Sequence, residues 1–186
     1  NVAQLVALGS YSHAALKDVV AQTGIEYQRL ERGIAHYYTD QKSFDGAADA
    51  AAVMQRFGVQ RRVVSRDELL KIEPALHAFA HRIKGGTYTQ SDESGDARVF
   101  TQQLAALCGQ RGAQMLFNHD IERIETAGDA VQQVRVRDRH TGIAKALKAD
   151  AFVVACGSYT TPLLKSIGVS VPIYPGKGYS ATLPLL

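Results

Sequence analysis

The stretch IERIETAGDAVQQVRVRDRHTGIAKALKADAFVVACG, residues 121–157, decides the fold class. Its first part contains three short strand-like runs, 121–126, 131–137 and 143–148, which are separated by glycine-containing turns. Alternation of apolar and charged residues in these runs predicts a small sheet with one face in water. The last part is a continuous apolar run over 151–155, which is typical of a strand buried on both faces of a parallel sheet.

Helices are predicted on both sides of these strands. A helix capped by Asp96 and ended by Gly112 precedes them, with a short strand over 114–117, and a helix over 162–167 and a last strand over 169–174 follow them. A helix, a meander and a buried parallel strand, in that order, indicate part of an open α/β nucleotide-binding sheet, where ligands bind at the carboxyl ends of strands. We therefore expect an α/β fold in which helices and strands are mixed (α+β).

The first 92 residues predict a second group of helices and strands. Apolar residues at helical spacing indicate helices over 11–24 and 44–58, each ended by a glycine. A capping box formed by Ser65 and Glu68 opens a further short helix, which Pro74 terminates. The predicted extended segments cover 27–38, 62–64 and 83–89. We expect these segments to form a mixed sheet with the helices packed on it.

Composition excludes several classes of protein. The chain has 186 residues, of which 46% are hydrophobic and 21% charged, so it is neither disordered nor of low complexity. Its net charge of +3 comes from scattered residues and does not indicate nucleic acid binding. The longest charge-free run, 151–164, is shorter than the about 18 apolar residues that a membrane span needs. Cys108 and Cys156 lie far apart in sequence, which favours a reducing compartment over a disulfide framework.

No metal site is predicted from the sequence. His77 and His81 are one helical turn apart, but no carboxylate lies between them and the chain has no HExxH pattern. The acidic segment 91–96 lacks the spacing of a calcium loop. A phosphate loop is excluded at Gly176-Lys177-Gly178, because Val171 stands where the GxxxxGK pattern requires glycine.

Gly157 is a candidate position for close approach of a ligand to the backbone. It follows the apolar run, and a glycine there lets a pyrophosphate or a ribose approach without meeting a Cβ atom. An ordinary tight turn between a strand and a helix also explains it, and no complete GxGxxG pattern occurs in the chain. The chain starts at Asn1 and stops in the apolar run 181–186, and we interpret both ends as cuts in a longer protein.

Taken together, several short motifs resemble a known family. They occur in order over essentially the whole chain: Ile72-Glu73-Pro74-Ala75-Leu76, Gly85-Gly86, Asp92-Glu93-Ser94-Gly95-Asp96 with Phe100-Thr101-Gln102, Lys148-Ala149-Asp150-Ala151, Gly157-Ser158-Tyr159, and Pro172 through Lys177-Gly178-Tyr179-Ser180. The sequence is similar to the D-amino acid oxidase-like flavoenzymes, and among them to the small, flavin-containing subunits of bacterial D-amino acid dehydrogenases.

The resemblance implies an FAD enzyme that oxidises D-amino acids, such as D-alanine, to 2-oxo acids and ammonia. Electrons would pass through FAD to the respiratory chain, with the protein peripheral to the cytoplasmic side of the bacterial inner membrane. Members of this family open with a GxGxxG turn and complete their flavin and carboxylate sites late in the chain. We therefore expect an internal piece, inactive and without FAD when isolated, because the helix N-terminus that would hold the pyrophosphate is missing.

The resemblance also assigns residues to the cofactor. Asp120 and Ile121 match the strand whose backbone lies near the adenine. Ala155, Cys156 and Gly157 match the strand end that passes the adenosine and the pyrophosphate. No residue is assigned a catalytic role, because oxidation of a bound amino acid needs mainly orientation and a deprotonated amine.

The substrate side is assigned in the same way. Tyr88, Lys177, Gly178 and Tyr179 match the sheet that faces the substrate. The corresponding division of the chain is a substrate-side lobe over residues 1–92, part of the FAD-binding domain over 93–168, and a return into the substrate-side sheet over 169–186.

Two alternatives stay open at the level of the sequence. A related FAD-dependent amine or glycine oxidase would pass its electrons to oxygen, and peroxide formation would distinguish it. A non-catalytic ligand-binding domain, complete at 186 residues, would need no further strands, and the missing first strand of the nucleotide fold counts against it.

Overall fold

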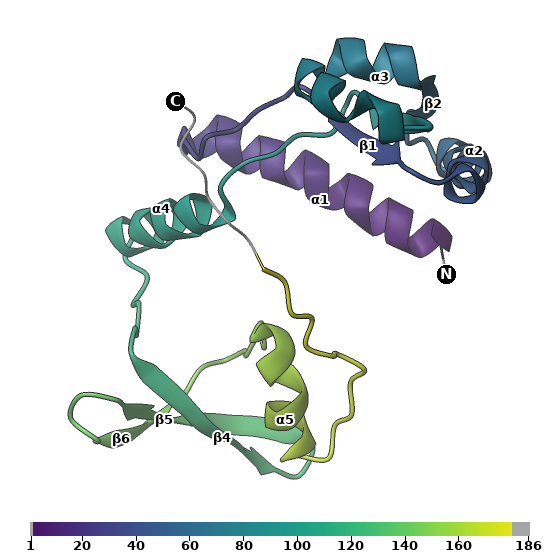
Figure 1. The fold of residues 1–186 in the computed structure, drawn as a ribbon. Helices are drawn as coiled ribbons and strands as arrows, with labels where there is room; N and C mark the ends of the chain where they lie inside the picture. The colour runs from purple at the N-terminus through teal and green to yellow at the C-terminus, as the bar shows by residue number, and fades with distance from the viewer. Residues whose placement is uncertain (1, 180–186) are drawn as a thin grey trace. The chain divides into compact units, whose positions relative to one another are not determined.

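The computed structural model describes residues 2–179 (Figure 1). The chain divides between Ala113 and Gln114 into two compact units. Each unit has its own sheet and its own helices, and each is described separately below. The functional division with borders after residues 92 and 168 stays a prediction.

The first unit contains most of the helices. Its elements, in chain order, are α1 (Val2–Thr23), β1 (Ile34–Tyr38), α2 (Gln41–Arg56), β2 (Arg61–Ser65), α3 (Arg66–Ile72), the 3₁₀ helix η1 (Pro74–Arg82), β3 (Gly85–Thr89) and α4 (Ala97–Gln110). The helices predicted from apolar spacing are confirmed, although α1 begins well before the predicted start at residue 11.

Side-chain caps set the starts of three helices in this unit. The Ser65 hydroxyl accepts a hydrogen bond from the Glu68 amide at 3.2 Å, which confirms the predicted capping box. Asp96 accepts one from the Val99 amide at 2.9 Å, as predicted for the N-cap of α4. Asp40 caps α2 in the same way. Each cap satisfies a backbone donor that the first turn of a helix leaves free.

The sheet of the first unit has the order β1-β3-β2, so the last strand lies in the middle. Both pairings are antiparallel, and the sheet that was expected to be mixed contains only antiparallel pairs among the described residues. The core of the unit is formed by Val64 of β2, by Leu69 and Leu70 of α3, and by Ile83, which lies between η1 and β3. Burial of these apolar side chains is the main stabilising contribution.

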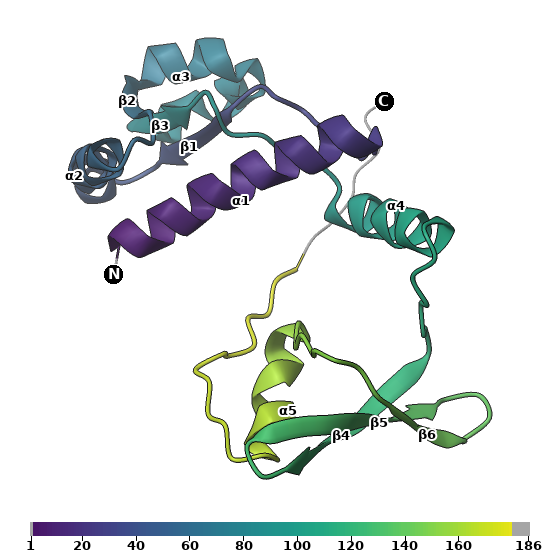
Figure 2. The same cartoon turned by 180° about the vertical axis from the view of Figure 1, so that it is seen from behind.

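The second unit is a three-stranded meander with one short helix. Its elements are β4 (His119–Ala127), β5 (Ala130–Asp138), β6 (Ala144–Leu147), the 3₁₀ turn η2 (Gly157–Tyr159) and α5 (Thr160–Lys165). The strands pair in the order β4-β5-β6, all antiparallel, which confirms the predicted meander. Both views place α5 beside β4 (Figures 1 and 2). The expected fold class, helices mixed with sheets, is confirmed.

Three predicted strands are wrong. Residues 114–117, 151–155 and 169–174 form no strand in the structure. The physical reason is the same in each case, since a strand is defined by hydrogen bonds to a neighbour and no strand of the described residues pairs with these segments. Nor is 151–155 buried on both faces: its residues alternate between exposed and partly buried, and Val153 is 91% exposed.

No helix within residues 2–179 combines the length and the apolar character that crossing a membrane requires. The longest helix, α1, has 22 residues but carries polar and charged side chains through its second half.

Candidate functional site

A cavity of about 610 Å³ lies in the second unit, between the start of β4 and the segment that leads into α5. Its lining residues are His119, Asp120, Ile121, Glu122, Arg139, Cys156, Tyr159, Pro162 and Leu163. Three of the predicted cofactor residues, Asp120, Ile121 and Cys156, therefore line one cavity although 35 positions separate Ile121 from Cys156 in the sequence.

The rim of the cavity is polar and fixed by an ion pair. Arg139 donates from Nε to Oδ1 of Asp120 at 2.8 Å, and a second guanidinium nitrogen contacts the same oxygen. This hydrogen bond, and then the charge of Arg139, hold the pKa of Asp120 below its ordinary value. The same contact raises the pKa of Arg139. The carboxylate at the rim is therefore ionised and already paired.

A contact between a histidine and a carboxylate supports the same end of the hairpin. His119 Nε2 lies 3.8 Å from Oδ2 of Asp138, and its Nδ1 lies 2.8 Å from the backbone oxygen of Phe117. Asp138 also accepts hydrogen bonds from the amides of His140 and Thr141, and these bonds are the main reason that its pKa is lowered. The turn after β5 is thereby held in one conformation next to the cavity.

The floor of the cavity is apolar. Ile121 and Leu163 also line an adjoining hydrophobic cavity of about 140 Å³, together with Phe152 and Val154 from the extended segment before α5. A polar rim above an apolar floor suits a flat aromatic group that carries hydrogen-bonding atoms at its edge.

Ala155 and Gly157 flank Cys156 but do not line the cavity. Gly157 opens η2 with a φ of +55°, in the region that favours glycine. An added Cβ at this position would meet no protein atom within 4 Å. The backbone of Gly157 is therefore open to approach from outside, with no packing reason within the chain for the absence of a side chain.

The predicted substrate-side residues fall in both units. In the first unit the Tyr88 hydroxyl donates to the backbone oxygen of Arg32 at 2.8 Å, and the Arg62 guanidinium lies 5.3 Å from the centre of the Tyr88 ring. The Tyr88 hydroxyl is thus already used within its own unit. In the second unit Lys177 Nζ lies 5.3 Å from the centre of the Tyr179 ring, which is 88% exposed.

Gly178 lies between Lys177 and Tyr179 in a segment without helix or strand. An added Cβ at Gly178 would meet nothing within 4 Å. The structure therefore gives no reason within the chain for a glycine at this position.

Sequence reasoning missed Arg139, Tyr159 and His119 as cavity residues. Arg139 reaches the cavity through the register of the hairpin, in which Asp120 stands opposite Arg137 and Arg139 is its diagonal neighbour on the same face. Tyr159 carried no such signal, since only the fold of the 3₁₀ turn brings it to the rim.

Among residues 2–179, no group of three or more histidine, cysteine, aspartate or glutamate side chains is placed to hold a metal ion. Of the acidic and histidine side chains that line the cavity, Asp120 pairs with Arg139, Glu122 pairs with Arg135 and Arg137, and His119 lies next to Asp138.

The ion pair at the rim gives a testable pH dependence. We expect Asp120 to titrate below its ordinary pKa in the wild-type chain, and to move back towards that value in Arg139→Gln. Because the pKa is lowered in the folded state, the pair stabilises the fold above the ordinary carboxyl pKa and loses this contribution as the pH falls through the lowered value. Carboxyl ¹³C shifts measured by NMR against pH would report both titrations.

The matched control is Arg123→Gln. Arg123 pairs with Glu125 on the same strand and should leave the Asp120 titration unchanged. Identical Asp120 titrations in the wild type and in Arg139→Gln would show that the ion pair does not form in solution.

The chain is similar in sequence to a family of known proteins and to several of its members. The family model described as FAD dependent oxidoreductase (DAO) matches residues 1–186. The chain is 46% identical over 185 residues to the D-amino acid dehydrogenase of Dechloromonas aromatica (strain RCB), covering 100% of this chain and 44% of that protein. It is 40% identical to the D-amino acid dehydrogenase of Granulibacter bethesdensis (strain ATCC BAA-1260 / CGDNIH1), covering 43% of it. The chain thus spans less than half the length of these relatives.

Solved structures share the fold at lower identity. Glycine oxidase from Geobacillus kaustophilus superposes with a TM-score of 0.72 at 22% identity, over 91% of this chain and 44% of that one. L-proline dehydrogenase from P. horikoshii gives a TM-score of 0.70 at 16% identity, over 86% of this chain and 40% of that one. At these identities the likeness shows the fold alone.

Proposed function

The chain belongs to the family of FAD dependent oxidoreductases, and from this we propose that it is part of a flavoenzyme that oxidises D-amino acids, such as D-alanine, to 2-oxo acids and ammonia. Two relatives at 40% and 46% identity, both named D-amino acid dehydrogenase, support this substrate class. The observation that carries the proposal is the cavity in which Asp120, Ile121 and Cys156 meet, because the family resemblance assigns these three residues to the cofactor.

The residues around this cavity fit the adenosine half of FAD. An apolar floor under Ile121 suits the face of an adenine, and the backbone of Asp120 and Ile121 offers hydrogen-bonding atoms at its edge. Cys156 would border the adenosine. Gly157 has open space where a Cβ would stand, so the pyrophosphate could approach its backbone. Ala155 would lie beside the adenosine, just before Cys156 in the chain.

When bound, FAD supplies the two-electron acceptor for oxidation of the substrate at its α-carbon. The contribution of this chain is to bind and orient. Arg139 neutralises Asp120, so the rim presents no unpaired negative charge to an anionic cofactor. We assign Tyr88, Lys177, Gly178 and Tyr179 to the substrate side, within residues 1–92 and 169–186, and the FAD-binding part to 93–168.

The relatives' name also indicates where the electrons go. A dehydrogenase passes electrons to an acceptor other than oxygen, and we propose a component of the respiratory chain as that acceptor. The protein would then lie at the cytoplasmic side of the bacterial inner membrane as a peripheral protein.

The test uses the complete enzyme that contains this chain. With D-alanine and an artificial electron-accepting dye, we expect one 2-oxo acid and one ammonia for each two-electron reduction of the dye, with water consumed, and no reaction with L-alanine. Peroxide formed in proportion to the 2-oxo acid would instead indicate an oxidase. An FAD-loaded enzyme that oxidises no D-amino acid would overturn the proposal.

A further inference from the structure

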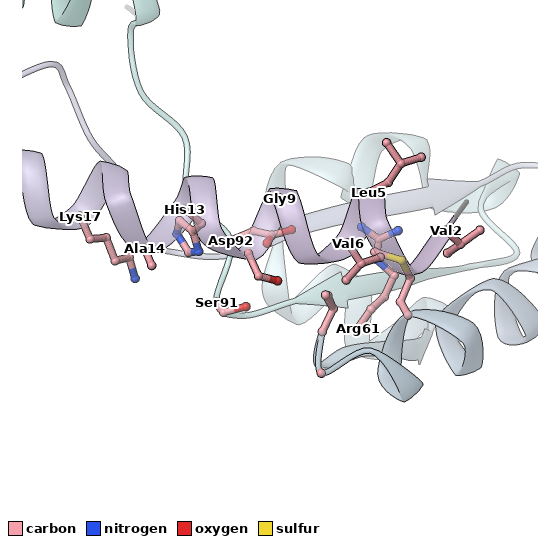
Figure 3. A pocket seen from close by; sticks show the side chains of 14 residues that line it. Val2, Leu5, Val6, Gly9, His13, Ala14, Lys17, Arg61, Ser91 and Asp92 are labelled. Carbon is pink, nitrogen blue, oxygen red and sulfur yellow. The ribbon is translucent and has the colours of Figure 1, made fainter.

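A groove of about 710 Å³ runs along α1 within the first unit (Figure 3). Its lining comes from α1, from the end of α2 and the turn that follows it, from the start of β2 and from the loop after β3. The lining residues are Val2, Leu5, Val6, Gly9, Ser10, His13, Ala14, Lys17, Met54, Gly58, Val59, Arg61, Ser91 and Asp92. None of them belongs to the cavity in the second unit.

The wall formed by α1 is held mainly by charged contacts. Val6 is the buried residue of this helix. His13 Nε2 lies 3.7 Å from Glu93 Oε1, and Lys17 Nζ lies 3.7 Å from Glu31 Oε1. The side chain of Glu93 is only 8% exposed, and it lies between His13 and Arg29. Arg29 Nε lies 3.4 Å from Oε2, the second carboxylate oxygen of Glu93. These contacts connect the middle of α1 to the segments around Glu31 and Glu93, and the first turns of the helix form one side of the groove.

The face of α1 that lines the groove is apolar, and a glycine leaves open space in it. Val2, Val6 and Gly9 recur at helical spacing and all line the groove, opposite Met54 and Val59. An added Cβ at Gly9 would meet nothing within 4 Å, so the space beside this residue is open. The groove therefore has room for an aliphatic chain that lies along α1.

Arg61 brings an uncompensated positive charge to this apolar groove. Its Nε donates to the Thr89 hydroxyl at 3.2 Å, and no carboxylate within residues 2–179 forms an ion pair with its guanidinium. Figure 3 shows the side chain rising from β2 towards α1 beside Val6. Its neighbour Arg62 lies on the opposite face of the sheet, where it pairs with Glu68.

The other charged residues of the groove set its selectivity. Besides Arg61, the lining contains the cationic side chain of Lys17, the imidazole of His13 and one acidic residue, Asp92. Lys17 pairs with Glu31 and His13 faces Glu93, so Arg61 is the cationic side chain of the lining that has no carboxylate partner among residues 2–179. A ligand with a second negative charge would meet the repulsion of Asp92, which favours a single carboxylate.

We propose that this groove binds an aliphatic monocarboxylic acid, with its carboxylate on Arg61 and its chain along Val6, Gly9 and Met54. A guanidinium presents two parallel N–H donors that match the two oxygens of a carboxylate, which makes arginine a better partner than lysine here. The apolar lining adds affinity that grows with the length of the chain. This inference does not depend on the proposed oxidation of D-amino acids.

The test uses the complete enzyme that contains this chain, with octanoate as the probe, and follows binding by saturation-transfer NMR and by titration of backbone shifts. Octanoate should bind and perturb α1 and the start of β2. Acetate, which lacks the chain, and octylamine, which carries the opposite charge, should bind about tenfold or more weakly. Equal binding of octanoate and octylamine, or no binding of octanoate, would overturn the proposal.

Two adjacent arginines provide a matched pair of variants. Arg61→Gln should weaken octanoate binding about tenfold, because it removes a charge-assisted hydrogen bond, whereas Arg62→Gln should leave it unchanged. Gly9→Leu should block the groove while favouring the helix, because leucine is a far better helix former than glycine. Unchanged binding in both Arg61→Gln and Gly9→Leu, with cooperative unfolding retained, would rule out this site.

Discussion

Gly157→Ala is expected to lower the affinity of the complete enzyme for FAD about tenfold or more, which corresponds to about 1.4 kcal/mol. The new Cβ meets no atom of the chain, so it does not disturb packing. It would instead occupy the space through which we propose that the pyrophosphate approaches the backbone. The measurement is the flavin content of the purified variant, followed by titration of the apoprotein with FAD.

Gly142→Ala is the control for this substitution. Gly142 also has a positive φ, +71°, and open space at its Cβ position, but it lies in the turn between β5 and β6 and does not line the cavity. Both variants carry the same backbone strain of about 1–2 kcal/mol. If both lose FAD equally, strain is the cause and Gly157 is not at the cofactor.

Alanine in place of Gly86 is expected to destabilise the fold by about 1–3 kcal/mol, in the range measured for overpacked cores. Gly86 lies in β3, the central strand, and an added Cβ would stand 2.4 Å from the backbone oxygen of His36 in β1. Leu69, at the centre of the core, is the next neighbour at 3.1 Å. A strand backbone that is hydrogen-bonded on both sides cannot move away, so the strain cannot be relieved cheaply.

Alanine in place of Gly46 should change the stability of the fold in the opposite direction. Gly46 lies inside α2 and a Cβ there would meet nothing within 4 Å, so Gly46→Ala should stabilise by about 0.5–1 kcal/mol through its helix propensity. Urea unfolding of the two variants and the wild type gives both free energies. A shift of the same sign in both variants would contradict the packing that the structure shows around β3.

Elements that depend on local chemistry could be predicted from the sequence. The cap by Ser65, the cap by Asp96 and the three strands of the meander need only neighbouring residues to form, and all are found where expected. The start of α1 was missed because its first turn carries no acidic side chain that would mark the beginning of a helix.

Elements that depend on distant partners could not be predicted. The apolar run 151–155 has the composition of a central strand, yet a strand needs hydrogen-bonded neighbours, and none is present among residues 2–179. The relatives are more than twice as long as this chain, and we propose that their further residues supply the neighbours.

The candidate site was predictable in part. Asp120, Ile121 and Cys156 were assigned to the cofactor through the family resemblance, and the structure brings them to one cavity, while their role at the cofactor stays a prediction. Arg139 and Tyr159 reach the same cavity only through strand register and a 3₁₀ turn, which a single sequence does not specify.

The exposed segment around Val153 bears on how this chain behaves at high concentration. An extended apolar stretch that contains Phe152 and the β-branched Val153 and Val154, without ladder partners among residues 2–179, is a template on which identical chains associate into intermolecular sheets. Lys148 and Asp150, just ahead of it, are charged residues of the kind that act as gatekeepers against such growth. Substitutions that neutralise these two side chains would therefore promote aggregation, although neither side chain lines the groove along α1 or the cavity in the second unit.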